Sequence, residues 1–441
     1  MLDKIFSRGK KKEEEPQVLP DIHFGRYSDN NKSVEKLERW NEAEALFKEK
    51  KYHESIAAFF DYLRDEEVDN VLLQKTEKGS NFQIYQGSKI IKGSYNAEWL
   101  EAEVALASMP VLIMPVMRRL LEMNFSLYYT HYALKGDDLC MLFDSDIETA
   151  NPSKLYYGLK ELSIKADKQD DLLVQDFTAL ISINTEHVTQ IPVEEKEVKY
   201  KFFQEWIKET LALIQTIDAD KYAGGVAYVL LALAYRIDFL IVPEGKLLSA
   251  LEKIVQVYFK KDDRPLSEKN AEMIEGFKKL QEKEKEEFFQ YLFRSRYTFS
   301  IVNPQNYKTV SDAIYNANQN IGWYKDNKHP EIAAKISEYG IAYCQYTYSL
   351  PRPVTEFFLL FTMFNYPEYF DALGFKTGYY SIEKKEFNKE AIIAATEAIQ
   401  QKWLPKYSGM KFNTENLKFK DKTTLNESFT SEVEALNLEI K

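Results

Sequence analysis

Residues 99–106 read Trp-Leu-Glu-Ala-Glu-Val-Ala-Leu, and this stretch decides the fold class of the N-terminal third of the chain. Every second residue from Leu100 to Leu106 is apolar, while Glu101 and Glu103 lie between them. Alternation with period two, with charges on one side, is typical of a half-buried strand. The stretch therefore predicts a sheet, not a helix, in this region.

Short apolar runs flank this strand on both sides, separated by glycine-containing turns that suit tight corners. Before it, a helix capped by Ser33 and a second helix precede runs at 71–74, 82–85 and 89–92. After it, we expect a helix from Pro115 to Asn124, strands at 125–134 and 139–143, and a helix that begins at Asn151-Pro152. Residues 33–168 should thus form one α+β unit with an antiparallel sheet.

This order of helix, strands, helix, two strands and helix resembles the type III secretion chaperone-like fold, which includes the YbjN family. The resemblance is carried by the 82–106 meander, the 115–124 helix, the 128–143 hairpin and the 155–166 helix, under a third of the chain. The resemblance implies a small α+β module that binds protein segments, often dimerises and has no catalytic activity of its own.

The whole chain is predicted to be α+β, with the chaperone-like module followed by a larger all-helical part. The expected divisions are a loose lead-in at 1–32, the module at 33–170, a helical domain at 171–410 and a polar, poorly packed tail at 411–441. The apolar run 222–235 is shorter than the roughly 20 residues that span a bilayer. It predicts a buried core helix that reaches the surface at Arg236 and Asp238.

Composition excludes several classes of function. The formal net charge of −11 disfavours nucleic acid as a partner, because an acidic surface repels phosphate backbones. The first residues lack the apolar core of a signal peptide, so we expect a cytoplasmic protein without a membrane partner. Two cysteines, Cys140 and Cys344, are too few for a disulfide scaffold or a four-thiolate metal site.

Motifs that would indicate catalysis are weak. A nucleophilic pair of His131 and Cys140 could arise across a hairpin, but a structural histidine is the favoured interpretation. The alternating acids at 144, 146 and 148 could ligate a cation, yet the spacing lacks the glycine and distal glutamate of a calcium loop. We therefore predict no catalytic, cofactor-binding or metal-binding residues. Arg118 and Arg119 could bind a carboxylate, or take part in surface ion pairs.

The sequence favours a noncatalytic protein-binding function, either chaperone-like or as an assembly scaffold. Its partner would be a protein or peptide segment, and homodimerisation stays open. We expect the module to present an apolar sheet face or an unpaired edge, with Trp99 and Tyr129 as aromatic anchors. The alternative is an enzyme with a pocket between the module and the helical domain. A third outcome, in which helices cover the sheet face, would make Trp99 a core residue.

Overall fold

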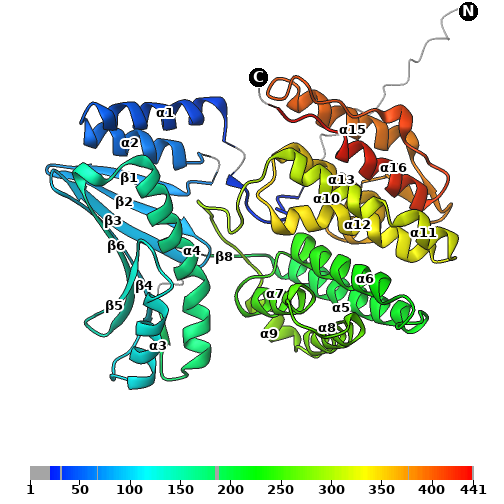
Figure 1. The fold of residues 1–441 in the computed structure, drawn as a ribbon, viewed down its shortest axis with the longest axis horizontal. Helices are drawn as coiled ribbons and strands as arrows, with labels where there is room; N and C mark the ends of the chain where they lie inside the picture. Colours follow the sequence, from blue (N-terminus) through cyan, green and yellow to red (C-terminus); the bar gives the residue numbers. More distant parts are fainter. Residues whose placement is uncertain (1–19, 30–31, 67, 184–187, 376, 440–441) are drawn as a thin grey trace, which may run out of the picture.

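The structure of this chain, a computed structural model, describes residues 20–29, 32–66, 68–183, 188–375 and 377–439. Two parts lie side by side (Figure 1): an α+β module formed by residues 34–182, and a helical part formed mainly by the described residues after them. The α+β fold with a following helical part, predicted from the sequence, is therefore confirmed.

The module contains an antiparallel sheet in the order β1-β2-β3-β4-β6-β5, with a short β7 that also pairs with β4. The stretch that predicted a sheet forms β4. The strands are β1 (Val71–Thr76), β2 (Gly79–Gln86), β3 (Lys89–Asn96), β4 (Trp99–Ser108), β5 (His131–Lys135), β6 (Asp138–Asp146) and β7 (Ile181–Ser182).

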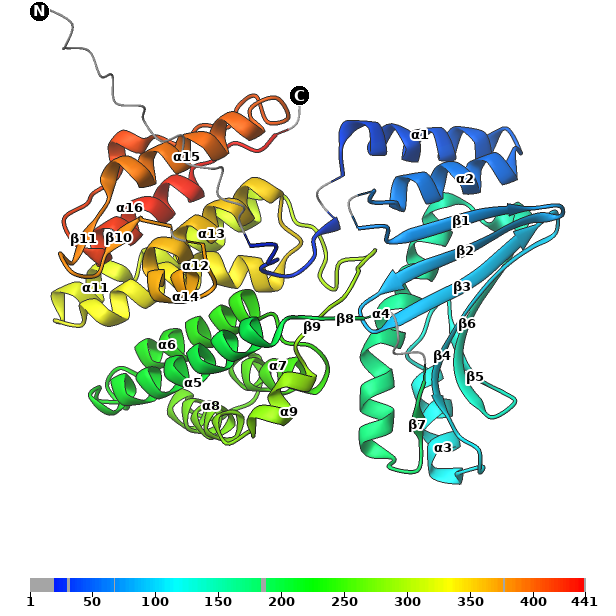
Figure 2. The ribbon, with the colours of Figure 1, turned by 180° about the vertical axis from the view of Figure 1, so that it is seen from behind.

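One face of the sheet is covered by helices, and the other is open. The module helices are α1 (Val34–Lys48), α2 (Tyr52–Leu63), α3 (Met114–Asn124) and α4 (Pro152–Asp176). Both views place α4 on the side of the sheet nearer the helical part (Figures 1 and 2), where Leu155, Leu159 and Leu162 are fully buried. The α1–α2 hairpin adds Phe59 and Phe60 to the same core. Among the described residues, no helix covers the opposite face.

The predicted strand at 125–134 is wrong over its first half. The chain after α3 forms a loop, and β5 begins only at His131. The reason is long-range hydrogen bonding. The amides of Tyr128, Tyr129 and Thr130 donate to the Glu161 carboxylate on α4, over 2.8–3.0 Å, instead of joining the sheet.

The helical part is built on a large core of buried side chains from nearly all of its helices. Its longer helices are α5 (Val193–Gln215), α6 (Ala223–Arg236), α7 (Gly245–Phe259), α8 (Leu266–Gln281), α10 (Tyr307–Asn318), α12 (Pro330–Thr347), α13 (Arg352–Asn365), α15 (Lys389–Trp403) and α16 (Lys422–Glu434). Shorter elements are β8 (Thr189–Gln190), η2 (Ile147–Thr149, in the module), α9 (Lys285–Gln290), β9 (Phe293–Arg294), α11 (Ile321–Asp326), α14 (Pro367–Ala372), β10 (Tyr380–Ser381), β11 (Glu386–Phe387) and η4 (Thr414–Asn416).

The apolar run 222–235 forms α6, a core helix as predicted. With the π-helical turn η3 (Ile237–Ile241), it is long and apolar enough to span a membrane, but most of it is buried within the protein. That burial is typical of the core of a soluble protein. Arg236 and Asp238 do not mark the surface, because both are nearly fully buried and each forms an ion pair.

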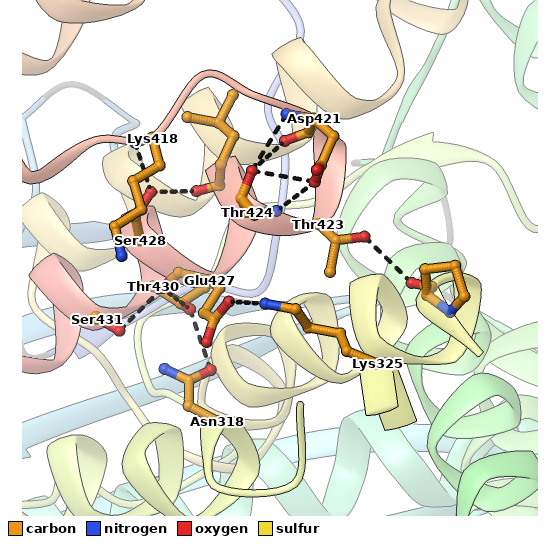
Figure 3. A network of polar contacts seen from close by, with 12 residues as sticks. Asn318, Lys325, Lys418, Asp421, Thr423, Thr424, Glu427, Ser428, Thr430 and Ser431 are labelled. Carbon is orange, nitrogen blue, oxygen red and sulfur yellow. Dashed lines mark hydrogen bonds and ion pairs between the residues drawn. The ribbon is translucent and has the colours of Figure 1, made fainter. Parts of the chain in front are cut away.

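The predicted polar tail is also wrong, since residues 411–439 pack on the helical core. In α16, Leu425, Phe429 and Val433 follow one another at steps of four and are fully buried. Figure 3 shows the polar side of the same helix, where Thr430 bonds Asn318 and Glu427 pairs with Lys325. Asp421 caps the first turn through the Thr424 amide.

Part of the predicted loose lead-in is ordered as well, whereas residues 1–19 and 30–31 lie outside the described residues. Phe24 packs against the helical core. Arg26 donates two short hydrogen bonds to the buried Asp238 carboxylate. Ser28 Oγ hydrogen-bonds Ser349 Oγ and the Leu350 carbonyl, so this segment joins the helical part.

Residues 297–299, which follow α9 and β9 of the helical part, pack against the module. Phe299 comes from the helical part of the sequence, yet it is fully buried among the module's core residues. Asn70 and Gln86 hydrogen-bond residues 297–299, with Gln86 Oε1 accepting from the Thr298 and Phe299 amides. The junction is therefore filled by packing and hydrogen bonds.

Candidate functional site

Trp99 lies at the start of β4 on the open face of the sheet, with 48% of its surface exposed. Its cross-strand partner on β6 is Asp146, and the next pair on the same face is Glu101 with Asp144. All three acidic residues are exposed. The open face is thus acidic around Trp99, and the prediction that it would be apolar is wrong. The possibility that helices bury Trp99 is wrong too.

Tyr129 lies in the loop before β5, and its side chain is also exposed. Strand β6 separates β5 from β4, so the two predicted anchors belong to different elements of the module. Tyr129 instead belongs to a group of exposed apolar residues around α3. This group, which we call the α3 patch, consists of Val111, Leu112, Met114, Leu121, Phe125, Tyr128 and Tyr129.

The α3 patch follows from the two faces of α3. Val116 and Leu120 are buried in the module core. Met114, Leu121 and Phe125 are spaced by seven and four residues, so they form a stripe along the opposite side of the helix. Phe125 is 95% exposed, and Tyr128 is 90% exposed. Soluble proteins rarely expose so many large apolar side chains together without a function.

The loop between α3 and β5, which carries Phe125, Tyr128 and Tyr129, is fixed by hydrogen bonds on both sides. Asn124 Oδ1 accepts from the Tyr132 amide at 2.7 Å, and its amide group donates to the Tyr132 carbonyl. On the other side, the Glu161 carboxylate accepts three consecutive amides and the Thr130 hydroxyl. These contacts fix the backbone between α3 and β5 while its aromatic side chains point away from the core.

Two arginines border the patch. Arg118 lies on the exposed stripe between Met114 and Leu121, and no carboxylate among the described residues pairs with it. Arg119 is exposed and lies 3.9 Å from Glu122. These residues, which the sequence marked as carboxylate binders or ion-pair partners, give a positive margin to an apolar surface.

A second candidate site is a hollow of about 1080 Å³ inside the helical part. We call it the Tyr366 cavity, after the residue that follows α13. Its aromatic wall consists of Phe202, Trp206, Phe364, Tyr366, Tyr369, Tyr380, Phe387 and Phe419. The enzyme alternative placed a pocket between the two parts, but this larger hollow lies within one of them. A second hollow, near Arg64 and Leu72, lies on the open sheet face.

Charged groups converge beneath Tyr366. Arg236 Nε donates to Glu338 Oε1 at 2.7 Å, while Lys335 Nζ and the Tyr366 hydroxyl donate to Glu338 Oε2 at 3.0 and 2.5 Å. Burial alone would raise the pKa of Glu338, but Arg236 and Lys335 lower it to about 2. Burial, assisted by Arg236 and Lys422, lowers the pKa of Lys335 to about 7. No local motif revealed this network, because its members are spread from residue 236 to residue 422.

The junction holds another titratable group, Glu244, which is buried and accepts from the Tyr297 hydroxyl at 2.5 Å. Burial, together with the nearby Asp167 charge, raises the pKa of Glu244 to about 8. Arg26 and Asp238 belong to the same region. This group lies in a packed interface and not in either hollow, so we regard it as structural.

The weak catalytic motifs do not assemble into a site. His131 is paired with Leu142, whereas Cys140 is paired with Ala133, so the two side chains are only diagonal neighbours. Burial raises the pKa of the Cys140 thiol, which disfavours the nucleophilic thiolate. Both cysteines are free and buried. Within the described ranges, no three His, Cys, Asp or Glu side chains are grouped to hold a metal ion.

Comparison with known proteins gives no assignment. No protein-family model matches the chain, and no curated protein sequence matches it significantly. The resemblance of the module to secretion chaperones therefore stays a prediction based on the order of its elements.

Proposed function

We propose that this protein is a noncatalytic, cytoplasmic protein-binding protein, and that its partner binds the α3 patch. The observation that carries the proposal is the exposure of seven large apolar residues on one short helix and its flanking loops. Aromatic and arginine residues are enriched at protein interfaces, and a few of them supply most of the binding energy. The patch contains Phe125, Tyr128 and Tyr129 next to Arg118.

The positive margin indicates the chemistry of the partner. Arg118 and Arg119 are both exposed, and a guanidinium binds a carboxylate well through two parallel hydrogen bonds. We therefore expect a partner segment with apolar side chains for the patch and Asp or Glu beside them. The acidic open face around Trp99 would repel such a segment, which leaves the α3 patch as the favoured surface.

A photo-crosslinking amino acid at position 125 of the full chain tests the proposal in the native cell. Tyr315, which is 48% exposed on α10 of the helical part, is the control position. We expect one dominant protein adduct from position 125 and none from position 315. The recovered partner, made separately, should bind the wild type and lose affinity for Phe125→Ala and Arg118→Glu. Because both side chains are exposed, stability should change by under about 0.5 kcal/mol.

Three results would overturn the proposal. The first is an equal set of adducts from both positions. The second is a dimer of this chain that Phe125→Ala dissociates, since the patch would then be occupied by a second copy and not by a different protein. The third is sedimentation with vesicles of phosphatidylcholine and phosphatidylglycerol that depends on Phe125, which would make the patch a membrane-binding surface.

A further inference from the structure

The Tyr366 cavity has the size and lining of a small-molecule site. Its volume of about 1080 Å³ is slightly above the usual range for ligand pockets, which is roughly 300–1,000 Å³. Aromatic rings from α5, the end of α13, the β10–β11 hairpin and the segment before α16 form its wall. Ligand sites commonly combine such a wall with a few converging polar groups, and here these groups gather around Tyr366.

Three cations surround the ring of Tyr366. The guanidinium carbon of Arg236 lies 4.4 Å from the ring centroid, Lys335 Nζ lies 5.1 Å from it, and Lys422 Nζ lies 5.4 Å from it. Attraction to the ring face stabilises each of them modestly. The ring thus collects positive charge at one place in the cavity.

One carboxylate neutralises only part of this charge. Glu338 contacts Arg236, Lys335 and the Tyr366 hydroxyl at once, so it cannot balance the whole group. Lys422 Nζ donates to a neutral acceptor, the Asn365 carbonyl, at 3.1 Å. Its side chain is exposed to the cavity. When Lys335 is protonated, Arg236, Lys335 and Lys422 together carry two more positive charges than Glu338 neutralises.

Among the remaining charged residues that line the cavity, acids outnumber lysines by five to three. The lysines are Lys201, Lys385 and Lys420, and the acids are Glu205, Glu209, Glu368, Glu386 and Asp421. Glu205 lies 3.9 Å from Lys201, and Asp421 caps α16. Glu209 and Glu368 lie near Lys422 and favour its protonated form. The rest of the wall is therefore net acidic, and the region between Lys335 and Lys422 is the part of the cavity that favours an anionic group.

We propose that the Tyr366 cavity binds a small organic anion, with a carboxylate or phosphate group between Lys335 and Lys422 and an apolar body against the aromatic wall. Lysine ammonium groups bind such oxyanions as point charges, without strict geometry. Tyr366 and Lys335 already share a hydrogen bond of 2.7 Å, so the Lys335 ammonium group is held at the floor of the site.

Binding should depend on pH in a predictable direction. The groups that face Lys335 are Arg236 on α6, Glu338 on its own helix, Tyr366 after α13 and Lys422 on α16. Without ligand, the pKa of Lys335 is about 7. An anion beside it favours the protonated form, so binding above pH 7 takes up a proton. Affinity should therefore fall as the pH rises from 6 to 9.

Calorimetric titration of the full chain with four probes tests the site. Phenyl phosphate and benzoate present the two oxyanions on an aromatic body, inorganic phosphate lacks the body, and benzylamine carries the opposite charge. We expect phenyl phosphate to bind with one site, inorganic phosphate to bind more weakly and benzylamine not to bind. The comparison of phenyl phosphate with benzoate shows which oxyanion the site prefers.

Matched lysine variants distinguish the cavity from general attraction to a charged surface. Lys422→Met and Lys335→Met should each weaken phenyl phosphate binding by about tenfold or more, since a hydrogen bond to a charged group is lost. Lys308→Met, on an exposed lysine of α10, should leave binding unchanged. The proposal is overturned if no oxyanion binds, if benzylamine binds as tightly, or if all three variants behave alike. None of these results bears on the α3 patch.

Discussion

Replacing Glu338 with Gln tests the charge network below the Tyr366 cavity. The substitution keeps the shape of the side chain and one carbonyl oxygen, but it leaves the buried Arg236 guanidinium without its counter-charge. The surroundings lower the pKa of Glu338 from 4.5 to about 2. This gap of about 2.5 pH units, at about 1.4 kcal/mol per unit, corresponds to roughly 3 kcal/mol of stability. Breaking a buried ion pair typically costs a similar amount, about 3–5 kcal/mol.

The sign of the pH dependence follows from the direction of this change. A carboxyl group whose pKa is lower in the folded chain stabilises the fold fully above its unfolded pKa. That contribution is lost as the pH falls through the folded pKa. For Glu338 the window runs from about pH 4.5 down to about pH 2. We expect Glu338→Gln to be less stable than the wild type by about 3 kcal/mol at pH 7, and this difference to disappear across the window.

Urea denaturation at a series of pH values, followed by tryptophan fluorescence and circular dichroism, measures the difference. Glu427→Gln is the matched control, because Glu427 pairs with Lys325 at 2.9 Å where both side chains are over a third exposed. An exposed pair contributes at most about 1 kcal/mol. Equal stability of Glu338→Gln and wild type at pH 7 would refute the reasoning, as would a difference that persists unchanged at pH 2.

Three further substitutions have defined outcomes. The pKa of Glu244 is raised to about 8, so its favourable contribution is present below pH 4.5 and lost as the pH rises through 8. Glu244→Gln should therefore be more stable than wild type at pH 8.5, by up to about 5 kcal/mol in urea denaturation, and equal stability there would contradict this. Gly87 has a φ of +55°, and an added Cβ would lie 2.0 Å from Asp167 Oδ1, so Gly87→Ala should cost more than about 2 kcal/mol, measured against wild type at pH 7. Trp99→Ala should cost under about 1 kcal/mol, because the ring is half exposed; a large drop in melting temperature would show that the open face is covered.

Local patterns in the sequence correctly predicted β4 and α6. The alternation in 99–106 predicted β4, in which Leu100, Ala102, Val104 and Leu106 are buried and Glu101 is exposed. The apolar run 222–235 gave α6, because a helix that is apolar all round must be buried. Both patterns report burial directly, and burial decides which side of an element faces the core.

Other features depend on residues that are distant in sequence. The loop 125–130 has the aromatic content of a strand, but Asn124 and Glu161 hold it outside the sheet. In 411–439 a stripe at Leu425, Phe429 and Val433 was present, yet the polar composition of the whole stretch outweighed it in the prediction. Neither a periodic pattern nor the composition of one segment indicated the Tyr366 cavity, because its walls come together only when α5, α13 and α16 pack.

The placement of Phe299 has a consequence for the order in which the chain is made. Residues 33–182 leave the ribosome before Phe299, so the core of the module is incomplete until Phe299 is made and packs into it. Until then, Gln86 also lacks the two amide partners that it has in the folded protein. We therefore expect the module to be only partly folded until Phe299 is synthesised, with its α3 patch already made and exposed. A partner that binds this patch could meet the chain before the helical part has been completed.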